Sequence, residues 1–575
     1  MPRPTTSTAP PLSSIAHATT LRVQTGTAIS TPRFLFALVI VVFGIVWFAT
    51  LGQRSLIHPD EGRYASIALE MARSGDWITP RLNGLLYFEK PALQYWIGAL
   101  FFQWLGPTEF AARLWPGLAG FLTVLLVGFT AARLWGQETG VRALAIAASM
   151  AWIAANGHFL SLDAGLMFFL TLSLCAWLIA EQPAAPADAA TRRNWVWLAW
   201  AGMAGAVLSK GLVGVLIPGC VLLISALSLR DLGLFRRMHG WSGAAIFLAL
   251  TVPWFVLVSQ RNPGFAEFFF VHEHLDRYLS NVHKREGAWW YFVPILLVGM
   301  LPWTSALPWL TRHGRVDEPD AERRARGLLI VWSAFVFLFF SASGSKLPSY
   351  ILPMFPGLAL LIALRLRHAQ AASLRWHLLL PVLAWVGILM VSTQAHRFVA
   401  AGTAVEAITE FSRVLQAGGL LFFAAAAIAW WLLARQRVTA AVLCLALGNL
   451  GATLTTLQAH DAFNEIKSAD RLAATLRPLI DERTPVFTLR SYDQTLPFYL
   501  RRSVVLVDYV DEFAFGQKHE PEKSLATLDA FVARWQALPQ AAAYMTEATW
   551  RELRDRGVPM RLVYQDARRL VVLKR

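Results

Sequence analysis

Charged residues are scarce in this sequence: only 15% of its 575 residues are Asp, Glu, Lys or Arg, whereas 56% are hydrophobic. Soluble domains carry about 25% charged residues, so the composition is typical of a chain that crosses a membrane several times. The 24 tryptophans agree, because indole rings favour the membrane interface. Many arginines stand between apolar runs, so membrane topology explains the formal net charge of +15 better than a nucleic-acid partner does.

Cysteine is also rare. The three cysteines, Cys175, Cys220 and Cys444, lie inside apolar segments and show neither a disulfide framework nor a metal-binding spacing. Residues 1–33 are rich in Ser, Thr, Pro and Ala, which predicts a disordered cytoplasmic tail. The run 34–52 is long enough to span a bilayer, and no small-residue cleavage site follows it, so we expect an uncleaved anchor.

Thirteen apolar runs are candidate membrane spans. They lie near 34–52, 112–132, 143–156, 164–180, 195–209, 211–229, 243–259, 289–310, 328–342, 350–364, 376–393, 416–434 and 438–457. The stretch 92–105 is short for a span, and we expect it to lie along the interface. With this assignment each of the six internal loops holds at least two arginines, as the positive-inside rule expects. The sequence therefore predicts a cytoplasmic N-terminus and an external C-terminus.

The character of the chain changes after residue 457. Residues 458–575 are polar and combine a helical pattern near 467–477 with the strand-like runs "VFTLRSY", "SVVLVDYV" and "RLVVLKR". We predict a transmembrane domain over 34–457, followed by a small mixed α/β domain on the external side.

Five polar motifs fall on the external side of this topology. They are "HPDEGRYA" (58–65), "YFEKPALQYW" (87–96), "GHFLSLDAG" (157–165), "FFFVHEHLDRY" (268–278) and "SGSKLPSYILP" (343–353). The first two lie in the long external loop 53–111, and the fourth lies in the external loop 260–288. Independent structural charges would be scattered over both sides, so the pattern favours a single external site.

Asp60 and Asp163 are the candidate catalytic carboxylates. A carboxylate at a membrane edge is often only hydrated or paired with a nearby arginine, and Arg63 is close to Asp60 in sequence. Asp163 stands between "FLSL" and "AGLMFFL" without a basic neighbour, where an unpaired charge is costly. Ionisable groups near a bilayer tend to be functional, so we predict a functional role for both.

Basic residues in the same motifs are candidate phosphate ligands. Lys90 and Arg63 are either snorkelling anchors or a clamp that binds phosphate through charge-assisted hydrogen bonds. Lys346 is a third candidate, and Lys210, between two apolar runs, ranks below it. Further donors suited to a phosphate or a sugar surround Lys346: Ser343, Ser345 and Tyr350.

A metal site is the weakest of these hypotheses. His272 and His274, with Glu89 from another loop, are candidate ligands for a divalent ion such as zinc. Histidines at i and i+2 share a face of a strand but not of a helix, so the spacing is unspecific. We expect no required cofactor, and the sequence contains no nucleotide-binding fingerprint.

Several of these segments together resemble a known family. "HPDEGRYA", "SGDWITPRLNGLLYFEKPALQYW", "SKLPSYILPMFP", "SYDQTLPFYLRR" and "VDYVDEF" resemble the bacterial lipid A aminoarabinose transferases, and the likeness covers nearly the whole chain. These are integral-membrane glycosyltransferases of the GT-C class, related to protein O-mannosyltransferases. One departure is Ala92, which stands where the family usually has the second proline of FEKPPL.

The resemblance implies an α-helical polytopic membrane protein of GT-C type, with about 13 transmembrane helices and a C-terminal periplasmic α/β domain. The donor would be undecaprenyl phosphate carrying 4-amino-4-deoxy-L-arabinose, and the acceptor a lipid A phosphate at the periplasmic face of the bacterial inner membrane. Such a reaction supports resistance to polymyxin and other cationic antimicrobial peptides.

The same resemblance implies roles for the candidate residues. Asp60 is expected as the principal catalytic carboxylate, with Asp163 second and Glu61 as a further catalytic candidate. Tyr64 is expected to bind substrate, and Glu61 and Tyr64 support the geometry. Lys90 and Arg63 match the phosphate-binding positions, and Lys346 assists them.

Two other classes remain open from the residues alone. One is a GT-C transferase that uses another polyprenyl-phosphate sugar, or a protein or glycan acceptor. The other is a transporter, which would favour ionisable residues near the bilayer midplane rather than at span ends. We expect a monomer whose remaining partners are membrane lipids.

Overall fold

A computed structural model describes residues 31–181, 189–276, 287–310, 318–394, 397 and 404–574. The predicted tail, 1–33, therefore lies outside the described residues except for the first turn of helix α1, which begins at Thr31. Most of the chain is helical, and the strands other than one short hairpin gather in the last hundred or so residues.

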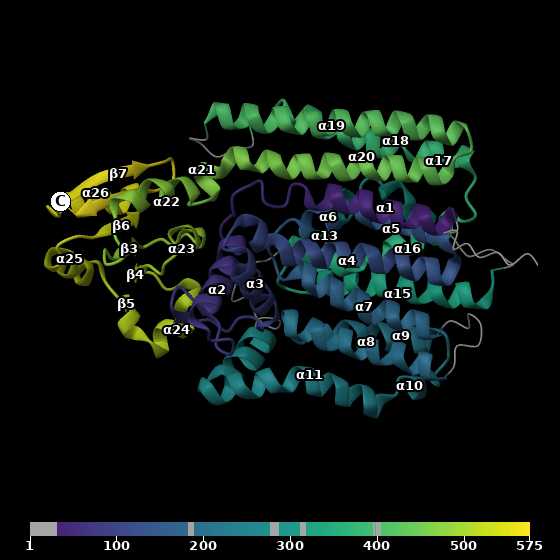
Figure 1. The fold of residues 1–575 in the computed structure, drawn as a ribbon, viewed down its shortest axis with the longest axis horizontal. Coiled ribbons are helices and arrows are strands. Elements are labelled where there is room, and N and C mark those ends of the chain that lie inside the picture. Colours follow the sequence, from purple (N-terminus) through teal and green to yellow (C-terminus); the bar gives the residue numbers. More distant parts are fainter. Residues whose placement is uncertain are drawn as a thin grey trace, which may run out of the picture.

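Long helices lie side by side along the longest axis of the molecule (Figure 1). The bundle, short helices included, consists of α1 (Thr31–Phe48), α4 (Glu109–Trp135), α5 (Gln137–Ser149), α6 (Ala151–Gly157), α7 (Asp163–Glu181), α8 (Ala189–Lys210), α9 (Val213–Ser228), α11 (Gly240–Arg261), α13 (Phe292–Gly299), α14 (Leu307–Leu310), α15 (Asp320–Ala342), the 3₁₀ helix η3 (Pro348–Met354), α16 (Phe355–Leu366), α17 (Ala371–His377), α18 (Leu379–Ser392), α19 (Val405–Ala434) and α20 (Val438–Ala459). The chain bends by 111° between α13 and the segment that holds α14. Each of the thirteen predicted apolar runs coincides with one or more of these helices.

Thirteen spans are not confirmed as a number. In the described part of the chain, eight helices are long and apolar enough to cross a membrane, or nine if the bent pair α13–α14 forms one span. Two further apolar helices are shorter, Phe34–Phe48 and Val213–Ser228. The other predicted runs form helices that are broken or less apolar, so length and composition do not decide whether they cross. The chain is a multi-pass membrane protein in either case.

Small residues let the bundle helices approach closely. A Cβ at Gly140 of α5 would lie 2.5 Å from the Cβ of Ala132 on α4, and one at Gly128 would lie 2.8 Å from the Cβ of Leu144. Such close contact is characteristic of membrane helices, whose association depends on van der Waals packing because lipid is as apolar as their side chains. Buried hydroxyls bond back within their own helix: Thr171 Oγ1 donates to the carbonyl of Met167 at 2.7 Å.

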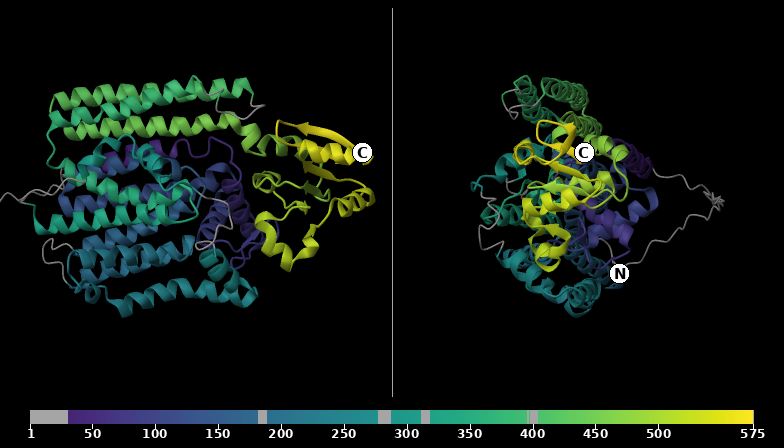
Figure 2. Two further views of the ribbon diagram at one scale, coloured as in Figure 1. Left: turned by 180° about the vertical axis from the view of Figure 1, so that it is seen from behind. Right: turned by 90° about the vertical axis from the view of Figure 1, so that its left-hand side faces the viewer.

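Two helices cross the end of the bundle. Helices α2 (Asp60–Ser74) and α3 (Leu93–Leu105) stand across the ends of the long helices rather than along them (Figures 1 and 2). This is the orientation predicted for the stretch 92–105. Between them, strands β1 (Arg81–Leu82) and β2 (Leu85–Leu86) form a tight hairpin, whose turn at Asn83 and Gly84 has φ values of 53° and 81°. An Asn-Gly pair favours that backbone.

Beyond these helices lies a small domain built on one sheet (Figure 2). The strand order is β5-β4-β3-β6-β8-β7. Strands β3, β4, β5 and β6 are parallel to one another, and β8 runs antiparallel to both of its neighbours, β6 and β7. The strands are β3 (Val486–Leu489), β4 (Val505–Val507), β5 (Ser524–Leu525), β6 (Ala542–Met545), β7 (Met560–Gln565) and β8 (Leu570–Lys574). The helices that accompany them are α21 (Asn464–Lys467), α22 (Asp470–Leu476), α23 (Thr495–Leu500), α24 (Ala514–His519), α25 (Leu528–Ala537) and α26 (Glu547–Asp555). The predicted mixed α/β domain is confirmed, and the three predicted strand runs contain β3, β4 and β8.

Candidate active site at the end of the bundle

Contacts near α2 and α3 link the described parts of the five polar motifs into one cluster. Asp60 opens helix α2 directly after Pro59, and its side chain is 41% exposed. An acid in the first turn is favoured by the positive end of the helix dipole. Arg63, one turn later, donates from Nη1 to Asp60 Oδ1 at 2.8 Å. Asp60 is therefore oriented by an arginine but still open to solvent, as a carboxylate that meets a substrate must be.

Glu61 does not suit the catalytic role that the sequence suggested. Its side chain is fully buried, and Arg113 of α4 grips both of its oxygens, with Nε at 2.7 Å and Nη2 at 2.8 Å. The backbone amides of Ile57 and Leu160 also donate to it, at 2.9 Å and 3.0 Å. Burial alone would raise the pKa of this carboxyl, but the charge of Arg113, aided by Arg54, lowers it to about 2. Glu61 thus ties α2, α4 and the segment before α7 together.

Arg63 is shared between two carboxylates. Besides Asp60 it bonds Glu512 of the sheet domain through Nε, and the other Glu512 oxygen accepts from Gln494 Nε2 at 2.7 Å. Burial raises the pKa of Glu512, and Arg63 opposes that rise. The sequence-based candidates did not include Glu512 or Gln494. A signal was present, because both stand in the tail segments "VDYVDEF" and "SYDQTLPFYLRR".

Tyrosines line the space next to Arg63. The Tyr64 ring lies 6.3 Å from that of Tyr95, and the hydroxyls of Tyr87 and Tyr95 are buried without a hydrogen-bond partner among the described residues. Burial raises the pKa of all three phenols, so they remain protonated donors. Tyr64 thus has the polar, aromatic surroundings predicted for a substrate-binding residue. The negative charge of Glu89 adds to the rise in the pKa of Tyr64 and of Tyr87.

Lys90 is held by an acid that the sequence-based candidates also did not include. Its Nζ lies 3.2 Å from Glu273 Oε2 and 2.7 Å from the carbonyl of Glu89. Glu273 lies on the π-helix η1 (Glu267–Asp276), and its side chain is buried. Lys90, whose side chain is partly buried, thus presents a cation near the site while the carboxylate of Glu273 balances its charge.

A second pair joins the site from the bundle side. Asp163, the first residue of α7, forms an ion pair with Lys210 at the end of α8, 47 positions away. Lys210 also lies over the ring of Tyr350, 4.7 Å from its centroid. The missing basic neighbour of Asp163 is therefore Lys210, which the sequence ranked below the other basic candidates.

Lys346 lies in the neighbouring loop and is buried. Its Nζ donates to the carbonyl of Ser343 at 2.6 Å, and Ser343 Oγ donates to the carbonyl of Ser345 at 3.1 Å. Ser345 Oγ is buried without a hydrogen-bond partner in the described part of the structure. The loop thus places a lysine and a spare hydroxyl close to Tyr350.

The metal hypothesis gains no support from the described residues. They contain no group of three or more His, Cys, Asp or Glu side chains arranged to hold an ion. His272 packs against Phe268, with ring centroids 5.4 Å apart, while the side chain of His274 lies outside the described residues. The proposed ligands Glu89, His272 and His274 stay a prediction, and no chemical step is routed through a metal.

A polytopic helical bundle that carries paired acids and bases at one end, under a small α/β domain, has the architecture of the GT-C class of membrane proteins. Residues 29–269 match the family described as dolichyl-phosphate-mannose-protein mannosyltransferase, and residues 472–574 match the one described as aminoarabinose transferase C-terminal domain. The two matches cover the bundle's first half and the sheet domain.

Comparison with individual proteins shows which members of these families the chain is similar to. An undecaprenyl phosphate-alpha-4-amino-4-deoxy-L-arabinose arabinosyl transferase of Pseudomonas paraeruginosa is 35% identical over 357 residues, covering 60% of this chain and 62% of that protein. A protein of the same name from Edwardsiella ictaluri is 34% identical, with the same coverage. The chain thus spans about three fifths of the length of the curated relatives it matches.

Solved structures extend the likeness to nearly the whole chain. The crystal structure of ArnT from Cupriavidus metallidurans bound to undecaprenyl phosphate superposes with a TM-score of 0.88 at 34% identity, covering 94% of this chain and 97% of that one. The apo state of the same protein gives a TM-score of 0.86 at 33% identity. This chain belongs to the aminoarabinose transferase family.

Proposed function

We propose that this protein transfers 4-amino-4-deoxy-L-arabinose from undecaprenyl phosphate to a phosphate of lipid A. The observation that carries the proposal is the likeness over 94% of the chain to ArnT bound to undecaprenyl phosphate. The cluster of acids and bases at one end of the bundle agrees with it. A lipid-linked phosphosugar presents its reactive bond at that depth, while its tail stays among the apolar helices.

The leaving group sets the chemical task. The bond between the anomeric carbon and the donor phosphate oxygen breaks, its electron pair stays on that oxygen, and undecaprenyl phosphate departs. A lipid A phosphate oxygen forms the new bond to the anomeric carbon. Cations beside the departing phosphate stabilise its growing charge, and we assign this role to Lys90 and Arg63, with Lys346 in support.

Each of these cations donates hydrogen bonds to an acceptor within the protein. Arg63 bonds Asp60 and Glu512, Lys90 bonds Glu273, and Lys346 bonds a backbone carbonyl. These contacts fix the positions of the three side chains. Donor binding then exchanges part of these contacts for phosphate oxygens, which costs little reorganisation.

The carboxylates act on the sugar side. A phosphate acceptor is already anionic, so a general base contributes less than the roughly 10²–10⁴-fold typical for a hydroxyl acceptor. Asp60, half open to solvent, instead stabilises positive charge that develops on the sugar ring and orients the sugar's ammonium. Asp163, paired with Lys210, contributes to the electrostatic potential at the sugar from the side of the helix bundle.

The location follows from the same proposal. We place the protein in the bacterial inner membrane as a monomer, with the site at the periplasmic face. The arginine-rich loops that join the bundle helices at the opposite end agree with a cytoplasmic location there.

A different acceptor is the second candidate. It is favoured by the match of residues 29–269 to a family named for protein mannosyltransferases. In that case a serine or threonine hydroxyl would attack, and Asp60 would act as general base. A transporter is disfavoured because the ion pair of Asp163 and Lys210 lies where helices α7 and α8 begin and end rather than in the middle of a span.

Mass spectrometry of lipid A tests both candidates. The protein is expressed in a host that makes the donor but lacks its own transferase. An aminoarabinose increment on lipid A, absent from the Asp60→Asn and Lys90→Met variants at equal membrane levels, is the expected result. No increment from well-expressed wild type would exclude lipid A as the acceptor, and labelled sugar on membrane protein would then support the second candidate.

A further inference from the structure

The sheet domain packs directly on the first turn of α2. A Cβ added to Gly62 would lie 2.4 Å from the backbone nitrogen of Thr495 and 2.5 Å from the carbonyl carbon of Gln494. Ser66 Oγ, one turn later, donates to the carbonyl of Gln494 at 3.1 Å. The backbone at 494–495 therefore forms a seat for the helix turn that carries Asp60.

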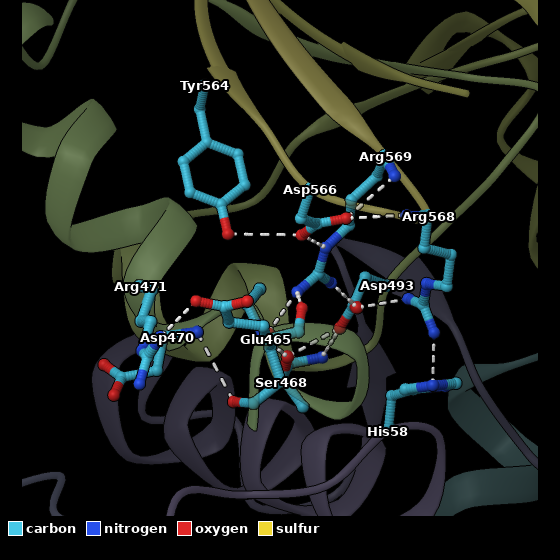
Figure 3. A network of polar contacts seen from close by, with 12 residues as sticks. His58, Glu465, Ser468, Asp470, Arg471, Asp493, Tyr564, Asp566, Arg568 and Arg569 are labelled. Carbon is cyan, nitrogen blue, oxygen red and sulfur yellow. Dashed lines mark hydrogen bonds and ion pairs between the residues drawn. The ribbon is translucent and has the colours of Figure 1, made fainter. Parts of the chain in front are cut away.

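Asp493 starts a polar chain that reaches the residue two positions before Asp60. Arg568, in the turn between β7 and β8, donates to Asp493 Oδ2 at 2.7 Å and bonds His58 Nε2 with its other terminal nitrogen (Figure 3). A guanidinium only donates, so Nε2 must accept and the imidazole must be neutral. Burial lowers the pKa of His58 to about 4, with Arg568 adding to the effect against Asp493, which agrees with a neutral ring.

Asp493 itself is fixed on all sides. Its side chain is fully buried, Oδ1 accepts from the amide and hydroxyl of Thr495 at 2.9 Å and 2.6 Å, and Arg569 bonds Oδ2. Arg569 is anchored in turn by Asp566, at 3.0 Å, and by the carbonyls of Glu465 and Ser468 (Figure 3). Because these bonds hold the Asp493 carboxylate in place, they also restrict the position of the Arg568 guanidinium that donates to it.

Gln494 starts a second chain that ends on Asp60. Its Nε2 bonds Glu512, Glu512 bonds Arg63, and Arg63 bonds Asp60. Asp493 and Gln494, which are adjacent in the sheet domain, are thus connected to the segment around Asp60 by two separate chains of contacts. One route holds the loop before Asp60, and the other holds the carboxylate of Asp60 itself.

We propose that Asp493 and Gln494 are positioning residues for Asp60, so that the C-terminal domain forms part of the active site. The inference rests on the proposed function, because Asp60 has a reaction to serve only if the protein is a transferase. A domain that merely covered the bundle would need packing at this surface. It would not need two charge-assisted chains, one that ends at His58 and one that ends at the exposed carboxylate of Asp60.

The test uses the full-length protein in vesicles that contain lipid A, with synthetic donor, and measures kcat and the KM for donor. His58→Leu removes the acceptor of the first chain, whereas His58→Gln keeps one within reach of Arg568. Arg568→Leu removes the bridge, and Gln494→Leu cuts the second chain. Arg556→Leu is the matched control, since this arginine bonds Asp529 and Glu552 within the same domain and makes no contact with α2.

Misplacing a reacting group by about 1 Å can cost roughly 10²-fold in rate. We expect kcat to fall about 10- to 100-fold in His58→Leu, Arg568→Leu and Gln494→Leu. The first two should leave the donor KM within about threefold, and combining them should cost little more than either alone. His58→Gln and Arg556→Leu should keep most of the wild-type kcat, with melting temperatures close to wild type throughout.

The outcomes separate the two proposals. Variants that match Arg556→Leu in an active protein overturn the positioning role and leave the proposed function standing. Fully additive losses in the double variant also overturn it, because the two residues would then act independently. Wild type that transfers sugar to no acceptor overturns both. If Arg568→Leu fails to fold, the comparison of His58→Leu with His58→Gln decides, because His58 is only partly buried.

Discussion

Glu61 and Arg113 form a two-point ion pair in which neither side chain reaches solvent. The pair joins the start of α2 to α4 of the bundle. It sits one residue from the exposed Asp60, so adjacent acids of one motif have opposite environments.

Loss of either partner of the Glu61–Arg113 pair should destabilise the fold. Removing one partner of a buried ion pair typically costs about 3–5 kcal/mol, because the other charge is left uncompensated. Glu61→Ala and Arg113→Ala should each lower the free energy of unfolding by that amount, measured by chemical unfolding in detergent. Glu61→Gln should be milder, since it keeps the hydrogen-bonding shape. A stable but inactive Glu61→Ala would contradict the structural role.

Asp60 should behave in the opposite way. Asp60→Asn is expected to lower kcat by about 10²-fold or more, since the charge that faces the sugar is lost. Its melting temperature should stay within about 2 °C of wild type, because the side chain is 41% exposed. Asp529→Asn, at a side chain 88% exposed in the sheet domain, is the control. Equal kinetics for the two variants would refute the catalytic assignment.

The Lys210–Asp163 pair allows structure and chemistry to be separated. Lys210→Met leaves Asp163 charged without its partner and should lower the free energy of unfolding by about 3 kcal/mol. The double variant with Asp163→Asn should recover most of that stability while remaining poorly active. Melting temperatures and kcat of both single variants and the double variant provide the measurement. Recovery of activity along with stability would assign the pair a purely structural role.

Glu273 bonds the same Lys90 ammonium that the proposed function assigns to the donor phosphate. Lys90→Met should weaken binding of undecaprenyl phosphate about tenfold or more, because a charge-assisted contact is lost. Glu273→Gln should strengthen binding several-fold, since the competing carboxylate is gone. Titration of tryptophan fluorescence with the lipid measures both. Weaker binding in Glu273→Gln would mean that Glu273 instead holds Lys90 in its binding position.

Stability should fall in two stages as the pH is lowered. His58 protonates near pH 6.5 in the unfolded chain but only near pH 4 when folded, so the unfolded state binds more protons between these values and stability drops there. Glu61 adds a second drop below pH 4.5, which continues towards its folded pKa of about 2. Melting curves at pH 7.5, 5.5 and 4.5 should show the first stage, and His58→Gln should flatten it. An unchanged slope in that variant would contradict a neutral His58.

Much of the fold could be predicted because apolar runs and arginine placement are local signals. Every predicted run is helical, and the crosswise helix α3 was expected from its short length together with the arginine pattern of the loops. The number of true spans was not, because helices such as α5 and α6 are broken at points that composition does not mark. The α/β character of the tail was also evident from its strand-like runs.

The site was only partly visible in the sequence, for a physical reason. Sequence shows which acids and bases share a side of the membrane, but not which of them pair. Glu61 was included among the catalytic candidates because its partner Arg113 lies 52 positions away and does not show in the motif. Glu512 and Glu273 were not proposed, since an acid in an external loop looks hydrated until the fold buries it.

The contact between Arg568 and His58 joins positions 510 residues apart. The ribosome therefore delivers the catalytic loop and all the bundle helices long before the turn that braces that loop. Throughout membrane insertion Asp60 lacks the support of the sheet domain, and the site closes only as the last strands pair. A chain interrupted late would therefore carry Asp60 without the contact between Arg568 and His58, and under the two proposals above it would be inserted in the bilayer but poorly active.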